Sequence, residues 1–208
     1  MSPEPFSPVM ADGPRGAGRG VGLFVAVVGP SGAGKDTLIR RAAAALGGDP
    51  GVVFARRIVT READPEAEDH ASLDLMAFEA REAAGRFCLA WGAHGLRYGL
   101  EQDLLAHIER GRLVVANLSR RAIGPAAVAF PRLAIAEITA PQAVLIERIV
   151  ARGRETRPEA KARAGREAPI DVPDGLEAHR RIDNRGALDE ATAAFLGFLA
   201  KCRETGLR

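Results

Sequence analysis

The stretch that determines the fold is LFVAVVGPSGAGK, residues 23–35. Its first six residues are continuously apolar, which is typical of a strand buried on both faces of a parallel sheet. The next seven fit the pattern G-x-x-x-x-G-K, and the residues after them predict a helix from Lys35 to about Leu46. A buried strand, a glycine-rich turn and a helix in this order indicate a phosphate-binding loop.

The chemistry of this turn is the binding of anions. Its glycines let successive backbone N–H groups turn inward, and the helix start adds partial positive charge. Lys35 supplies a point charge for the outer phosphates, which makes it a candidate catalytic residue. We predict that a phosphate-bearing cofactor binds along Gly29, Pro30, Ser31, Gly32, Ala33, Gly34, Lys35, Asp36 and Thr37.

Asp36 departs from the usual pattern, which has Ser or Thr after the lysine to contact Mg²⁺ through a hydroxyl. A carboxylate is also a hard-oxygen ligand that Mg²⁺ accepts. Asp36 is therefore a candidate metal ligand, directly or through water. The alternative is that it only places a favourable negative charge in the first helical turn.

Strand and helix patterns alternate along the rest of the chain. We predict strands at residues 52–60, 87–91, 113–116, 133–139 and 182–184, and helices at 73–84, 100–110, 141–152 and 188–203. This alternation predicts an α/β fold of three α/β/α layers with a parallel core sheet, whose ligands sit at the carboxyl ends of the strands. Residues 1–21 are rich in Pro and Gly without any period, so we expect a disordered tail before one domain at 22–205.

Composition excludes several classes of protein. The net charge is only +2, so a protein that coats nucleic acid is not expected. Two cysteines cannot form a disulfide framework, and no apolar run approaches the roughly 20 residues of a membrane helix. No signal-peptide pattern is present. We expect a cytoplasmic protein with no membrane partner, and a homodimer is left open.

Four stretches resemble the guanylate-kinase-type phosphotransferases across roughly residues 22–203. They are GPSGAGKDT at 29–37, RRIVTR at 56–61, FCLAWGAHGLRYG at 87–99 and LIERIVARGRET at 145–156. The groups that read guanine are absent. Leu89 stands where guanylate kinases place a Glu, and His70 aligns with one of their tyrosines. The chain thus keeps the motifs that bind phosphate in guanylate kinases but lacks the side chains that recognise guanine.

The chain is similar to a narrower family, the ribose 1,5-bisphosphate phosphokinases of phosphonate catabolism. The stretches GPSGAGKD, LAWGAHGLRYG, ARGRE and IDNRGAL carry this resemblance, and Leu118 departs from it because Gly is expected before Ser119. The resemblance implies that a small-molecule phosphosugar, ribose 1,5-bisphosphate, is phosphorylated on its 1-phosphate. The implied donor is ATP with Mg²⁺, and the implied product is 5-phosphoribosyl 1-diphosphate (PRPP).

A phosphate acceptor is already ionised near pH 7, so such a site needs cations rather than a general base. Arg57 and Arg61 share one face of the predicted strand, up to ~13 Å apart at ~3.3 Å per residue, and could serve two phosphates. We assign Arg97 and Tyr98 to the acceptor phosphate and His94 to the sugar or a phosphate. The acceptor-binding region is then about 56–99. The alternative for the arginines at 56–61 is a solvated edge strand, and the alternative for His94 is a purely structural role.

Residues 148–167 contain seven basic and three acidic side chains. Alone, such a segment would be a solvated charged helix, but the resemblance implies a mobile lid at about 153–170. Arg148 and Arg152 form an i, i+4 pair that we expect near the transferring phosphoryl group, as catalytic residues. Arg163 is a third candidate, for the substrate, and Asn184 is expected against the adenine.

Three other functions remain as alternatives. A nucleoside monophosphate kinase acting on GMP is disfavoured by Leu89, which cannot accept hydrogen bonds from guanine. A nucleotide-binding regulator without turnover is disfavoured by Lys35 and the set of arginines. A shikimate- or gluconate-type kinase is weaker still, because a hydroxyl acceptor would require a nearby carboxylate base.

Overall fold

The structure is a computed structural model that describes residues 22–61, 70–93, 95–151, 153, 155–165, 170 and 172–206. The predicted tail at 1–21, the candidate site residues His94 and Arg152, and part of the predicted lid lie outside these described residues. None of the described helices is long and apolar enough to cross a membrane.

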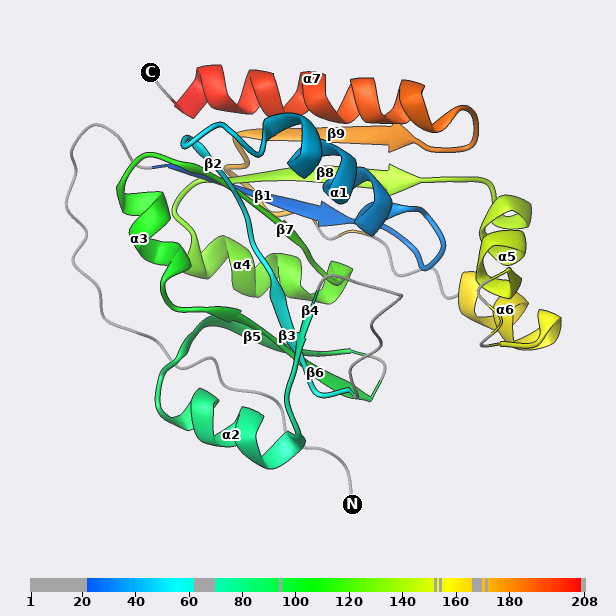
Figure 1. Cartoon of the computed structure of the whole chain (residues 1–208), viewed down its shortest axis with the longest axis horizontal. Helices are drawn as coiled ribbons and strands as arrows, with labels where there is room; N and C mark the ends of the chain where they lie inside the picture. Colours follow the sequence, from blue (N-terminus) through cyan, green and yellow to red (C-terminus); the bar gives the residue numbers. More distant parts are fainter. Residues whose placement is uncertain are drawn as a thin grey trace.

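Strands and helices alternate through most of the chain (Figure 1). The order is β1 (Leu23–Val28), α1 (Lys35–Leu46), β2 (Val52–Phe54), β3 (Arg57–Val59), β4 (His70–Ser72), α2 (Leu75–Ala83), β5 (Phe87–Ala93), β6 (Leu96–Glu101), α3 (Leu104–Glu109), β7 (Leu113–Asn117), the 3₁₀ turn η1 (Arg120–Ala122), α4 (Ile123–Ala129), β8 (Leu133–Thr139), α5 (Gln142–Val150), α6 (Arg157–Ala164), β9 (Ala178–Asp183) and α7 (Leu188–Gly206).

The predicted parallel core sheet is confirmed. Its strand order is β2-β7-β1-β8-β9, and every neighbouring pair is parallel. β1 lies at the centre, and its side chains alternate between two apolar clusters, one shared with α1 and α7 and one shared with α3 and α4. Figure 1 shows these helix pairs on opposite faces of the sheet, which gives the three α/β/α layers. Burial on both faces explains why β1 is apolar throughout.

A second, smaller sheet has the order β4-β3-β6-β5, with β3 and β5 antiparallel to β6. The prediction of one strand over residues 52–60 is wrong, because this run is divided between the two sheets. Val52 to Phe54 pair with β7 in the core sheet, whereas Ile58 and Val59 pair with β6. The intervening residues carry the chain from one sheet to the other.

The predicted helix over residues 100–110 is also partly wrong. Leu100 and Glu101 end strand β6, and the helix begins only at Leu104. The spacing of the leucines is helical, but Leu100 pairs with Leu89 across the antiparallel ladder, so long-range pairing overrides local periodicity. Three further elements, β4, β6 and α4, carry no prediction of their own from the sequence pattern, whereas α6 lies within the charged segment at 148–167, for which the sequence predicts a solvated helix or a lid.

Candidate active site

The predicted phosphate-binding loop, residues 29–35, which we call the phosphate loop, begins where β1 ends, at the carboxyl edge of the core sheet. Gly29 has φ 145° and Gly34 has φ 90°, which side-chain-bearing residues rarely adopt. A Cβ at Gly29 would lie 2.1 Å from the carbonyl oxygen of Ile138, and one at Gly34 would lie 2.4 Å from Nδ2 of Asn184. The two glycines are therefore required by both backbone conformation and space.

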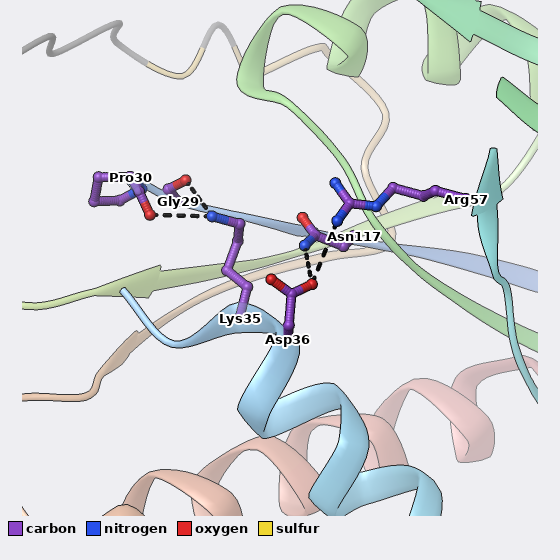
Figure 2. Close-up of polar contacts among 6 residues, drawn as sticks. All are labelled: Gly29, Pro30, Lys35, Asp36, Arg57 and Asn117. Carbon is purple, nitrogen blue, oxygen red and sulfur yellow. Dashed lines mark hydrogen bonds and ion pairs between the residues drawn. The ribbon is translucent and has the colours of Figure 1, made fainter. Parts of the chain in front are cut away.

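Lys35 folds back onto its own loop. Its Nζ donates hydrogen bonds to the carbonyl oxygens of Gly29, at 2.8 Å, and Pro30, at 3.0 Å (Figure 2). This ammonium group is thus held directly over the turn where the sequence predicts phosphates. Both of these acceptors are neutral backbone carbonyl oxygens.

Asp36 follows at the start of α1 and points away from Lys35, toward β7 and β3 (Figure 2). Its Oδ1 accepts a hydrogen bond from Nδ2 of Asn117 at 2.5 Å. The same oxygen lies 3.4 Å from Nη2 of Arg57, with which it forms an ion pair. One carboxylate oxygen therefore contacts the last residue of β7 and the first of β3.

The loop forms one wall of a cavity of about 370 Å³. Among the described residues, six cationic side chains and one carboxylate line it. The lining residues are Gly29, Pro30, Ser31, Gly32, Gly34, Lys35, Asp36, Arg57, Arg61, Ala93, Tyr98, Asn117, Leu118, Ser119, Arg120, Arg121 and Arg163. Such an excess of positive charge beside an anion-binding loop suits a ligand with several phosphates.

The wall opposite the loop comes from the second sheet. The rings of Trp91 and Tyr98 are stacked 5.4 Å apart, with an angle of 11° between their planes. The guanidinium of Arg57 lies 5.8 Å from the centre of the Tyr98 ring. Trp91 also donates from Nε1 to Oγ of Ser119 at 3.0 Å. Arg57 thus rests on an aromatic stack that is itself fixed to the loop after β7.

Helix α6 adds a third wall. Its Ala160 and Ala164 are buried in the core cluster, and α6 packs on α5. Arg163 on the same helix donates from Nε to Oγ of Ser31 in the phosphate loop, 3.0 Å away, and its Nη1 pairs with Glu155. Figure 1 shows α5 and α6 beyond the carboxyl ends of β1 and β8. Part of the predicted lid therefore reaches the loop.

Several predicted site residues do not line the cavity. Arg97 lies next to Tyr98 on β6 but pairs with Glu82 of α2 at 2.6 Å, and its guanidinium lies over Phe78. Successive residues of a strand point to opposite faces, so Arg97 and Tyr98 cannot both face the cavity. Ala33 and Thr37 also fall outside the lining.

Asn184 and Arg148 lie behind the phosphate loop rather than in the cavity. Asn184 is 2% exposed and donates from Nδ2 to the carbonyl oxygen of Ala33 at 2.7 Å. Arg148 of α5 donates from Nη2 to the backbone oxygen of Asn184 at 2.8 Å. In this structure the two side chains brace the backbone of the loop.

The structure adds cavity residues that carry no prediction from the sequence, among them Asn117, Ser119, Arg120 and Arg121. All four lie at or just beyond the end of β7, beside the phosphate loop. Their position after the predicted strand at 113–116 could have indicated them, because ligands of parallel sheets bind at the carboxyl ends of the strands. Arg120 and Arg121, three and four residues after the end of the buried strand β7, could have been chosen on that ground.

Comparison with known proteins gives a consistent set of relatives. The chain is 46% identical over 181 residues to the ribose 1,5-bisphosphate phosphokinase PhnN of Methylobacterium radiotolerans, covering 87% of this chain and 99% of that protein. The enzyme of the same name from Brucella melitensis is 47% identical over 178 residues, covering 86% and 92%. A bifunctional ribose 1,5-bisphosphokinase-thymidine phosphorylase of Cupriavidus pinatubonensis is 46% identical, but the match spans only 30% of its length.

Among solved structures, the guanylate kinase of Anaplasma phagocytophilum aligns with a TM-score of 0.58 at 15% identity, covering 89% of this chain and 90% of that one. At this identity the likeness supports the fold alone. No protein-family model matches the chain.

Proposed function

This chain belongs to the family of ribose 1,5-bisphosphate phosphokinases, and we propose that it transfers the γ-phosphoryl group of ATP to the 1-phosphate of ribose 1,5-bisphosphate. The product is PRPP, formed during phosphonate catabolism. The observation that carries the proposal is the cavity, whose lining among the described residues combines the predicted phosphate-binding loop with five arginines and one carboxylate.

The charge of this cavity matches the demands of the reaction. Both substrates are polyanions, and the attacking oxygen belongs to a phosphate that is already ionised near pH 7. The enzyme must bring two phosphate groups together and offset their repulsion, and proton abstraction is not required. Lys35, Arg57, Arg61 and Arg163 provide fixed positive charge from the loop, the second sheet and α6.

We assign the roles by the wall from which each side chain comes. The loop N–H groups and Lys35 bind the outer phosphates of ATP. Arg57, Arg61 and Tyr98 on the opposite wall bind the phosphates of the sugar. Arg163 of α6 lies beside Ser31 and is placed to stabilise the charge of the transferring phosphoryl group.

The residues beside the loop also fit Mg²⁺. This ion commonly binds one or two carboxylates together with substrate phosphates. Asp36 provides the carboxylate, and Oδ1 of the 5% exposed Asn117 is buried without a hydrogen-bond partner among the described residues. We propose that these two oxygens hold Mg²⁺ with ATP. When bound, the metal would neutralise part of the negative charge on the phosphoryl group that is transferred.

Leu89 explains why GMP is not the proposed acceptor. Its side chain is 5% exposed in the apolar cluster between the second sheet and helices α3 and α4. It does not line the cavity. Guanine carries donors that need a buried acceptor, and this position of β5 provides only hydrocarbon.

The experiment is an ADP-release assay with ATP, Mg²⁺ and separate acceptors: ribose 1,5-bisphosphate, ribose 5-phosphate, GMP and buffer. We expect release well above background only with ribose 1,5-bisphosphate, and a new diphosphate ester in the ³¹P NMR spectrum of the product. Faster turnover of GMP than of ribose 1,5-bisphosphate would overturn the proposal in favour of a guanylate kinase.

A further inference from the structure

Asp36 is contacted from two sides of the cavity. It is the second residue of α1, beside the phosphate loop, whereas its partner Arg57 begins β3 in the second sheet. Nη2 of Arg57 lies 3.4 Å from Oδ1 of Asp36, and Nδ2 of Asn117 lies 2.5 Å from the same atom (Figure 2). The ion pair therefore bridges the wall assigned to the nucleotide and the wall assigned to the acceptor.

Arg57 has little freedom to leave the cavity. Its side chain is 11% exposed, and its guanidinium lies over the Tyr98 ring. Tyr98 stacks on Trp91, whose Nε1 is bonded to Ser119. A guanidinium that lies over an aromatic face keeps its N–H donors in its own plane, along its edges, where anions in the cavity can reach them without disturbing the stack.

Arg57 and the proposed Mg²⁺ compete for the same carboxylate, that of Asp36. Among the described residues that line the cavity, Asp36 is the only acidic one, and it faces six cationic side chains. When Asp36 binds Mg²⁺, its negative charge is offset and its attraction for Arg57 falls. Arg57 is then held less strongly by Asp36, and the cavity that it lines is where the acceptor phosphates are placed.

We propose that Asp36 exchanges Arg57 for Mg²⁺ when the nucleotide binds, and that Arg57 is thereby released to the acceptor phosphate. The Mg²⁺–nucleotide complex and the acceptor then each strengthen the binding of the other, because coupling between two sites is reciprocal. Tyr98 and Trp91 act as positioning residues for Arg57. The identity of the acceptor rests on the proposed function, whereas the competition at Asp36 does not.

The competition is tested without any acceptor. The affinity for a non-hydrolysable ATP analogue is measured by calorimetry over a range of Mg²⁺ concentrations. Arg57→Gln removes the competing charge and keeps much of the side chain, so it should lower the Mg²⁺ concentration for half-maximal nucleotide binding on the order of tenfold. Arg41→Gln is the matched control, because Arg41 is an exposed arginine of α1 that pairs with Asp189. An Mg²⁺ requirement that is unchanged or higher in Arg57→Gln overturns the proposal.

The release of Arg57 is tested through the fluorescence of Trp91, the single tryptophan of the chain, which stacks on Tyr98. Wild-type protein should bind ribose 1,5-bisphosphate on the order of tenfold more tightly when Mg²⁺ and the analogue are present. In Asp36→Asn the ion pair with Arg57 is already absent, so this enhancement should disappear. An equal enhancement in both proteins overturns the coupling. If ribose 1,5-bisphosphate does not bind at all while Arg57→Gln behaves as expected, the proposed acceptor is wrong and the exchange at Asp36 stands.

Discussion

Nε of Arg163 lies 3.0 Å from Oγ of Ser31, so a hydrogen bond joins α6 to the phosphate loop. Glu155 holds the other side of the same guanidinium through Nη1. Arg163 is thereby placed at the cavity, although Ala160 and Ala164 of its helix are buried in the core cluster. One face of α6 packs against the core cluster, while another places the Arg163 cation at the cavity.

Replacing Arg163 should slow catalysis more than it weakens binding. Arg163→Ala removes a charge that we place beside the transferring phosphoryl group, so kcat should fall on the order of 10²-fold with a smaller change in KM. Arg157→Ala is the matched control, because Arg157 is on the same helix but is exposed and pairs with Glu147. Steady-state kinetics of both variants check this, and equal losses in the two would contradict the role of Arg163.

Lys35 should be essential for activity but not for folding. Its Nζ is bonded to two carbonyl oxygens of its own loop, so Lys35→Met leaves the apolar core untouched. Loss of one well-placed transition-state charge should reduce the rate on the order of 10²–10³-fold. Thermal unfolding should stay close to that of the wild type. Lys201→Met, on the exposed face of α7, serves as the control, and near-normal turnover by Lys35→Met would refute the loop assignment.

Placing a glutamate at position 89 should not create a guanylate kinase. Leu89 is packed in the apolar cluster, so Leu89→Glu buries an unpaired carboxylate. We expect this change to lower the free energy of unfolding by about 3–5 kcal/mol. Leu89→Met, which conserves volume, should cost less than about 1.5 kcal/mol. Urea unfolding and GMP-dependent ADP release measure both effects, and a stable Leu89→Glu variant that phosphorylates GMP would show that the side chain reaches the cavity.

The two cysteines should be unreactive in the folded protein. Burial is the main cause that raises the pKa of Cys88, and likewise that of Cys202, from the usual 9.0 to about 12. Unfolded thiols ionise near pH 9.0, so the stability that the neutral buried thiols contribute is present below that pH and is lost as pH rises toward about 12.

The rate of alkylation by iodoacetamide, measured against pH, tests this directly. We expect slow labelling at pH 8 and a rate that still rises above pH 10, whereas protein in guanidinium chloride should react quickly. A labelling rate that levels off near the ordinary thiol pKa would contradict the burial of these groups.

The predicted phosphate loop and the core strand before it follow from the amino-acid sequence alone. Both are local properties: the glycine positions allow the turn, Lys35 follows directly, and a run such as Leu23–Val28 can only be buried on both faces. The strand at 133–139 and the helix that follows Pro141 are also predicted by local sequence alone, because the apolar run and the proline lie within or directly before each element.

Which side chains meet in the cavity depends instead on the tertiary structure. The run at 52–60 has one continuous strand-like pattern, and only its pairing with two different neighbours divides it between two sheets. Tyr98 lies on the face of β6 that meets the cavity, and Arg97 lies on the opposite face. Which face meets the cavity depends on a strand register that is set by residues far away in the sequence. The contact of Asp36 with Arg57 likewise joins elements of separate layers. Periodicity tells which residues share a face, but long-range pairing decides what that face contacts.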